Sequence, residues 1–373
     1  MTRSNENRDE SAGRTSNRRT FLGAVAGTTA VLAGCNSEDA ERRTAEPEAT
    51  GTTTATATGS PSPTETPSPT PSDAAIEHLD TTRDELTAAF AMLRKANVYD
   101  VENRLYHLDF EALRAFDPDP VLDRISTATN ALHGAREELR DEAPKQHTVN
   151  ALLSLTVIGR AGANLYPEIQ TTYTGVWNGL RARQRGDDAE ALEHMKEVIQ
   201  TPERWKAPAE ELTDGVKSMT ATGYPPGVGE FESLRWVKVA RLAREAPSEF
   251  RRIGLAQEAF TKADVSYFDG LFAFDDEDWD TAIRNFEVAQ SLYYTAYDNA
   301  ASLRDDDTYG FYQTIVDAHF CKGSKMRRAS RYLMQAAEAY SNGDTETGEE
   351  KEERGREEVV EGGNNCTKFP TTR

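Results

Sequence analysis

The chain has 373 residues and a formal net charge of −20, with 63 acidic against 43 basic side chains. This charge excludes proteins that bind nucleic acid or an anionic membrane by electrostatic attraction. No segment approaches the run of about 20 apolar residues that is needed to span a bilayer, so the sequence predicts no transmembrane helix.

The first organised element is an uncharged, mostly apolar segment, Phe21–Ala33, which follows two adjacent arginines and precedes Gly34-Cys35. As a helix it would be about 20 Å long, shorter than the ~30 Å hydrocarbon core of a bilayer. This length is typical of the apolar region of a signal peptide rather than of a spanning helix. The small residues before Cys35 would let a peptidase approach the backbone.

The stretch Ser16–Cys35 resembles a twin-arginine export signal that ends in a lipoprotein cleavage box. Arg18 and Arg19 stand where that pattern has its arginine pair, and Cys35 stands at its lipidated position. The resemblance implies that residues 1–34 are removed and that the folded protein stays lipid-anchored on the outer face of the cytoplasmic membrane. An uncleaved anchor or a chance cysteine is the alternative.

The acidic residues are spread along the chain, and arginine outnumbers lysine by 32 to 11. This composition resembles that of haloarchaeal surface proteins. Molar salt shortens the electrostatic screening length to about 3 Å, which makes self-repulsion tolerable. An ordinary acidic protein is the alternative.

Residues 35–72 form the lipidated cysteine and a tether. From Thr44 to Ser72 the segment consists almost entirely of Thr, Ser, Pro, Ala, Gly and Glu, and it has no large apolar residue to bury. The tether from Asn36 to Ser72 is therefore predicted to be disordered, with an average reach of about 35 Å that would hold the following domain clear of the membrane.

From Asp73 onward the apolar residues recur at helical spacing, and no alternating strand pattern of useful length is found. The predicted fold class is all-α. The helical region could form one large core or two subdomains. The best seam lies at 221–230, which is rich in Gly and Pro and would divide an N-terminal helical subdomain, 73–220, from a C-terminal one, 230–366, which precedes a tail at 367–373. After helices that begin at Asp73 and Asp119, we expect helices at 147–165, 168–184, 189–200, 203–219, 230–246, 248–275, 279–304, 308–341 and 344–360.

Internal similarity suggests repeated helical hairpins within these helices. Residues 266–300 resemble a tetratricopeptide repeat, because small residues at Gly270 and Ala282 would let two helices approach while Phe286 fills the adjoining space. Residues 175–199 show a second copy, and residues 331–359 a weaker third. The copies are irregularly spaced, so the resemblance implies an irregular, tetratricopeptide-like solenoid or bundle; generic antiparallel hairpins are the alternative.

Two cysteines, Cys321 and Cys366, remain if Cys35 carries lipid, and an exported protein lies in an oxidising compartment. If the chain turns at Asn342-Gly343, the residue opposite Cys321 on the returning helix falls near 364. We therefore expect a disulfide between them, with two free thiols as the alternative. The returning helix needs such a covalent link because 345–358 has no large apolar residue.

Aromatic residues gather between 267 and 312, and several of them cannot share one buried stripe. Tyrosine combines an apolar ring with a hydrogen-bonding tip, so this cluster predicts a binding groove for a peptide or glycan, with core packing as the alternative. The residues expected to line the groove are Trp279, Tyr293, Tyr294 and Tyr297.

No motif for a catalytic nucleophile, a phosphate-binding loop or a metal centre is present, and the six histidines form no close ligand pair. We predict no catalytic residue, metal or cofactor. The resulting hypothesis is a cell-surface, lipid-anchored scaffold that binds a protein or peptide partner and no nucleic acid. The alternative is an extracytoplasmic enzyme or small-molecule-binding protein that acts on envelope material.

Overall fold

The computed structural model describes residues 72–96, 115–139, 143–225, 227–229, 231, 233–304, 310–366 and 368. Helices make up almost all of these residues, and the described part contains no strand, which confirms the all-α prediction. In chain order the helices are α2 (Asp73–Ala96), α4 (Asp119–Glu138), α5 (Ala143–Gln184), α6 (Asp188–Ile199), α7 (Thr201–Thr222), α8 (Ser233–Asp275), α9 (Trp279–Arg304), α10 (Gly310–Ser341) and α11 (Thr345–Asn365).

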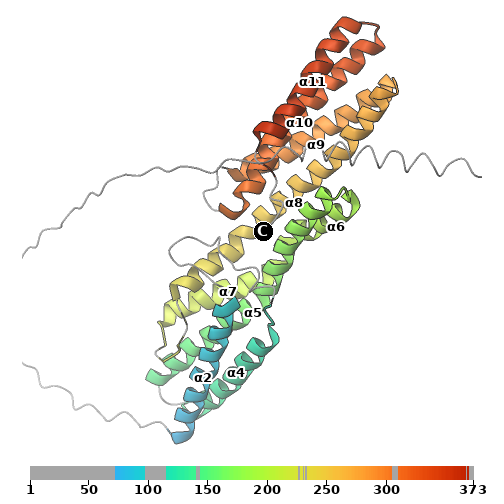
Figure 1. Ribbon diagram of the computed structural model, residues 1–373. Helices are drawn as coiled ribbons and strands as arrows, with labels where there is room; N and C mark the ends of the chain where they lie inside the picture. Colours follow the sequence, from blue (N-terminus) through green and yellow to red (C-terminus); the bar gives the residue numbers. More distant parts are fainter. Residues whose placement is uncertain are drawn as a thin grey trace, which may run out of the picture.

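The molecule is elongated, and the 43-residue helix α8 runs through most of its length (Figure 1). Its first half lies with α2, α4, α5 and α7 at one end of the molecule, and its second half packs with α9 at the other end, where α10 and α11 complete the C-terminal region. At about 1.5 Å per residue, α8 spans roughly 65 Å, so one helix connects both ends.

The predicted helix boundaries at 165–168 and 246–248 are wrong. Pro167 lies inside α5, and Pro247 lies inside α8. A proline inside a helix removes one backbone hydrogen bond and costs about 3 kcal/mol. Here the flanking turns are buried on both sides of each proline, for example Tyr166 and Ile169 in α5, so tertiary packing keeps each helix continuous.

The predicted seam at 221–230 does not separate two cores. One hydrophobic cluster extends across it, from Ala75 in α2 through Ile253 in α8, and it also includes residues at the end of α9 and near the start of α10. The loop itself is packed: Phe231 is buried, and its ring lies 4.9 Å from Phe90 of α2. A second cluster begins at Ala259 in α8 and includes other residues of α9 and α10, so the boundary between the two clusters crosses α8, α9 and α10.

The three predicted hairpins are present and share one turn geometry. In each turn a residue with positive φ donates its backbone N–H to the carbonyl of the residue three positions earlier. The aspartate that follows it donates its own backbone N–H to the carbonyl of the residue five positions earlier. The aspartate carboxylate then caps the next helix by accepting a hydrogen bond from the N–H three residues on. The residue pairs are Gly186-Asp187, Glu277-Asp278 and Gly343-Asp344.

The hairpins differ in what fills the space between their helices. A small residue stands seven positions before each positive-φ residue: Gly179, Gly270 or Ala336. Phe286 packs so closely on Gly270 that a Cβ atom there would lie 2.8 Å from its ring, and Met195 fills the same place beside Gly179.

Helix α11 packs on α10 through glycines rather than through large apolar residues. Gly348, Gly355 and Gly362 recur every seven residues and are all buried. A Cβ atom at Gly355 would lie 2.8 Å from Leu333 Cγ and 3.3 Å from the Ala329 carbonyl oxygen. The glycines therefore allow a close approach of the two helices, a means of packing that the sequence analysis did not predict.

A disulfide joins Cys321 to Cys366, as predicted, with 5.5 Å between the Cα atoms. It fixes the end of α11 against α10. Beside it, Lys325 pairs with Glu358 at 3.2 Å and also with Glu361.

No helix in the described ranges combines the length and apolar character that crossing a membrane requires.

Candidate functional site

The candidate site is a row of stacked side chains on the outer seam between α9 and α10, which we call the aromatic ladder. It runs through five residues in the order Arg327, Tyr294, Tyr297, Phe320 and Arg304. Three rings therefore lie between two guanidinium groups.

Helical periodicity places these side chains together. Tyr294, Tyr297 and Arg304 are three and seven residues apart, which puts them on one side of α9. Phe320 and Arg327, seven residues apart, lie on one side of α10. The antiparallel crossing of the two helices then brings both sets into a single row.

Gly323 sets the separation of α9 and α10 beneath the ladder. A Cβ atom at this position would lie 3.2 Å from the Tyr293 carbonyl oxygen and 3.2 Å from the Tyr297 backbone nitrogen. Any larger residue would therefore push backbone against backbone. The close approach lets the Tyr297 ring stack on Phe320 at a centroid distance of 4.8 Å.

The ladder is accessible and cationic at both ends. Tyr294 is 46% exposed, and the Arg327 guanidinium carbon lies 4.5 Å from the centre of its ring. At the other end the Arg304 guanidinium carbon lies 4.5 Å above Phe320, and its Nε lies 3.8 Å from Asp317. Such cation–π contacts hold the rings in place and leave the outer edges of the rings accessible to a binding partner.

Only two of the four residues predicted to line a groove belong to the ladder, namely Tyr294 and Tyr297. Tyr293 is fully buried, so its assignment to a groove is wrong; neighbouring helix positions point about 100° apart, and Tyr293 faces the core. Trp279 is half-buried at the far end of the hairpin, where its ring stacks on Tyr340 with centroids 5.2 Å apart. Tyr309, Phe311 and Tyr312, also in the aromatic cluster, have side chains outside the described residues.

Buried Tyr293 takes part in a polar network that the sequence analysis missed. Its hydroxyl donates to Asp264 Oδ1 at 2.6 Å, and Arg183 donates to Asp264 Oδ2 through Nε at 3.2 Å and Nη2 at 2.9 Å. Burial and the neighbouring Asp264 carboxylate raise the pKa of Tyr293 above its usual range, so this hydroxyl stays protonated. The network joins α5, α8 and α9.

Helix α10 adds two further ionisable groups to this region. His319 is buried, and its ring lies 5.6 Å from that of Phe260. Burial and the nearby Arg183 lower the pKa of His319 to about 3, so its imidazole is neutral at ordinary pH. Burial, and secondarily Arg183, lower the pKa of Lys322 to about 8.

No sequence signal marks Arg183, Asp264 and Lys322 as a group. They lie on three different helices and are far apart in sequence. Only the packing of α5, α8 and α10 brings them together.

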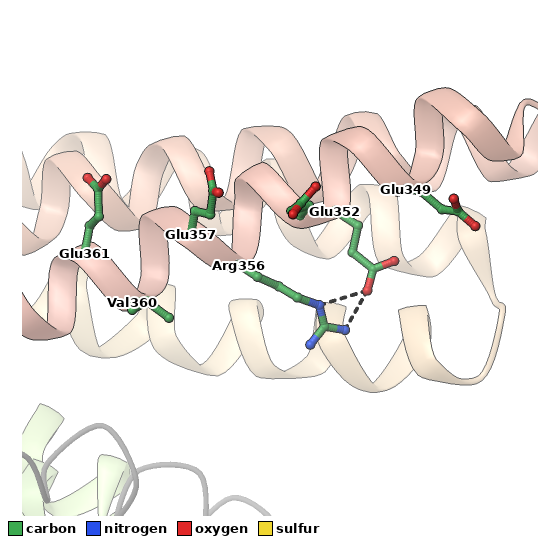
Figure 2. Close-up of a pocket in the computed structure, with 7 residues that line it drawn as sticks. Glu349, Glu352, Arg356, Glu357, Val360 and Glu361 are labelled. Carbon is green, nitrogen blue, oxygen red and sulfur yellow. Dashed lines mark hydrogen bonds and ion pairs between the residues drawn. The ribbon is translucent and has the colours of Figure 1, made fainter.

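The outer face of α11 presents carboxylates beside a groove of about 620 Å³. Figure 2 shows Glu352 and Arg356 directed toward each other, with a hydrogen bond of 2.8 Å from Arg356 Nε. Glu357 and Glu361 stand further along the same helix. Across the described part of the chain, no group of histidine, cysteine or acidic side chains is arranged to hold a metal ion.

The residues of the predicted export and lipidation signal, Arg18, Arg19 and Cys35, lie outside the described residues, as does the tether. Comparison with known protein families, with curated proteins and with solved structures gives no significant match to the chain.

Proposed function

We propose that the chain is a lipid-anchored cell-surface protein whose helical domain binds an acidic segment of another protein along the aromatic ladder. The observation that carries this proposal is the ladder itself, which combines tyrosine and arginine side chains in one row, with Tyr294 and Arg304 exposed. Tyrosine and arginine are enriched among the residues that dominate protein–protein binding energy. Their stacking pre-orders the side chains, which lowers the entropy lost on binding.

The charge of the chain favours an acidic occupant for this particular strip. With a net charge of −20, most of the surface repels an acidic partner. The ladder offers two guanidinium groups, from Arg304 and Arg327, separated by apolar rings. An extended segment that alternates carboxylates with apolar or aromatic side chains matches that order, because guanidinium groups bind carboxylates and rings stack on rings.

The proposed location rests on the signal-like residues. Arg18 and Arg19 would direct export of the folded chain, and Cys35 would carry the lipid. The Thr-, Ser- and Pro-rich residues up to 72 would then let the ladder reach partners beyond the membrane surface.

We further propose that the hairpins form a tetratricopeptide-like solenoid. Support comes from the shared turn and from the small residue at an equivalent place in each first helix, Gly179, Gly270 or Ala336. Stacked hairpins of this kind present an extended surface to a partner segment.

The test is affinity capture of envelope proteins at native salt on the immobilised chain, followed by mass spectrometry. The informative variant is Arg327→Glu, which reverses one end of the ladder. Its matched control is Arg241→Glu, a charge reversal at an exposed arginine of α8 that pairs with Glu245. Thermal unfolding of both variants checks that the fold is kept.

We expect the wild type and Arg241→Glu to capture the same acidic partner and Arg327→Glu to capture at least about tenfold less, the loss of roughly 1.4 kcal/mol or more. The double variant Tyr294→Ala/Tyr297→Ala should lose the partner as well. Equal capture by Arg327→Glu, or no partner for the wild type, would refute the proposal.

A further inference from the structure

A small cavity lies in the C-terminal region, away from the aromatic ladder. It has a volume of about 100 Å³ and lies between α8, α10 and α11, with Arg183 reaching it from α5. On the α11 side its wall includes Gly362 and Gly363, which have no side chains to fill the space. An engineered cavity of about 150 Å³ binds benzene, so this one has room for one compact molecule no larger than about a single ring.

The feature that points to a ligand is the hydroxyl group of Tyr267, a residue of α8 that lines the cavity. Tyr267 is only 2% exposed, yet its hydroxyl forms no hydrogen bond with any residue in the described part of the chain. Buried polar side-chain atoms in proteins nearly always have a hydrogen-bond partner. This hydroxyl is therefore a position at which a bound molecule can supply the partner.

Packing directs the Tyr267 hydroxyl toward the cavity. The ring of Tyr267 lies in the second hydrophobic cluster, with its centroid 5.8 Å from that of Phe286 and 6.4 Å from that of Tyr293. Burial raises the pKa of the hydroxyl, so it keeps its proton and can donate a hydrogen bond. Arg356 of α11 acts against this shift, so the hydroxyl lies on the side of α8 that faces α11 and the cavity.

The charged groups at the cavity already have partners within the protein. Arg183 donates two hydrogen bonds to Asp264, which also accepts one from Tyr293. Lys322, the other cation among the described lining residues, likewise interacts with the protein. A charged ligand would therefore lose its hydration without gaining an unpaired charge in return, so the chemistry of the cavity favours a neutral ligand.

The rest of the wall is apolar. Phe260 and Phe268 of α8 contribute rings, and Val359 of α11 contributes methyl groups. Met326 of α10 has a flexible thioether side chain that can adapt to the shape of a ligand. Pockets for small molecules combine such apolar walls with a few polar groups that orient the ligand.

We propose that this cavity binds a compact, neutral organic molecule that carries an oxygen atom on an apolar body. The oxygen accepts a hydrogen bond from the Tyr267 hydroxyl, and the apolar body lies against Phe260, Phe268 and Met326. Water is the competing occupant, but it gains nothing from contact with the apolar walls. The cavity shares no residue with the aromatic ladder, so either proposal can fail while the other stands.

The test uses phenol as the probe and toluene as a control of nearly the same size and shape that cannot accept the hydrogen bond. Each is titrated into the oxidised full chain at pH 7, where phenol is neutral, and binding is followed by nuclear magnetic resonance. We expect one phenol molecule to bind per chain, with saturation at millimolar concentrations or below.

The informative variant is Tyr267→Phe, which removes the hydroxyl and keeps the ring. It should weaken the binding of phenol at least about tenfold, because the hydrogen bond is lost, and it should not weaken the binding of toluene. The matched control is Tyr340→Phe, which removes a hydroxyl that donates to Glu352 outside the cavity. This control should leave the binding of phenol within about twofold of the wild type.

A second variant, Met326→Trp, fills the cavity while keeping the Tyr267 hydroxyl, and it should abolish the binding of phenol. Circular dichroism and thermal unfolding establish that each variant is folded. Unchanged binding of phenol by Tyr267→Phe or by Met326→Trp, or equal weakening of phenol and toluene by Tyr267→Phe, would overturn the proposal. The absence of saturable phenol binding would also overturn it, because the cavity would then hold water only.

Discussion

The α8–α9 and α10–α11 hairpins share a turn but are held together by different means. Both turns have a positive-φ residue followed by a capping aspartate. In the first hairpin Phe286, which is fully buried, fills the space beside Gly270. In the second hairpin the equivalent position is Glu352, which accepts a hydrogen bond from the Tyr340 hydroxyl.

The difference shows that the turn fixes the register of a hairpin without fixing what stabilises it. The first hairpin depends on the burial of large apolar side chains, which contributes in proportion to the area removed from water. The second depends on close helix approach at glycines, on ion pairs such as Arg328 with Glu358, and on a disulfide. The two hairpins should therefore respond differently to the same kinds of change.

The largest expected effect is that of Phe286→Ala in the first hairpin. Removing this ring leaves a cavity between Gly270 and the second hydrophobic cluster, and such substitutions cost about 3–5 kcal/mol of unfolding free energy. Glu352→Ala, at the equivalent position of the second hairpin, removes the half-buried hydrogen bond from Tyr340 and the exposed pairing with Arg356, so we expect about 1–2 kcal/mol. Denaturant unfolding of both variants measures the contrast, and equal losses would contradict it.

A smaller effect is expected for Gly355→Ala in the second hairpin. Helix propensity alone would make this change stabilising by about 1 kcal/mol. The new Cβ atom would instead lie 2.8 Å from Leu333 Cγ and close to a backbone carbonyl, so we expect a net loss of about 1–2 kcal/mol.

The control for that variant is Glu357→Ala, on the exposed side of the same helix, which should change stability by less than about 0.5 kcal/mol. A more stable Gly355→Ala protein in thermal unfolding would show that α11 does not approach α10 as closely as described.

The smallest effect is expected at the turns. Glu277 is the one non-glycine residue with positive φ in the described ranges, where the other two hairpin turns have Gly186 and Gly343. Replacing Glu277 by Gly removes the steric cost of this conformation and should stabilise the protein by about 0.5–1 kcal/mol. Gly343→Ala should destabilise the protein by a similar amount. Thermal unfolding of the two variants tests both expectations.

Much of this C-terminal region could be predicted from the sequence. Apolar spacing located α9 and α10, and counting from the turn at Asn342-Gly343 placed Cys366 close to the position opposite Cys321, so the predicted disulfide is confirmed. These inferences succeeded because they depend on local periodicity and on the antiparallel geometry of a short turn.

The candidate site could be predicted only in part. Tyr294 and Tyr297 were identified as aromatic residues for binding, but Phe320 and Arg327 were not, since the register between α9 and α10 depends on Gly323 and on tertiary packing. The same limit applies to Arg183, Asp264 and Lys322, which come from three separate helices. The packing of α11 was missed because glycine carries no apolar signal.

The most direct test of the contrast between the hairpins is hydrogen exchange of the intact protein, measured by mass spectrometry before and after reduction of the disulfide. Its loop of 45 residues corresponds to about 4 kcal/mol in the chain-entropy model. We predict that reduction accelerates exchange throughout α11 and leaves α9 protected, because the burial of Phe286 does not depend on the disulfide. Unchanged protection of α11, or a simultaneous loss in α9, would contradict the account.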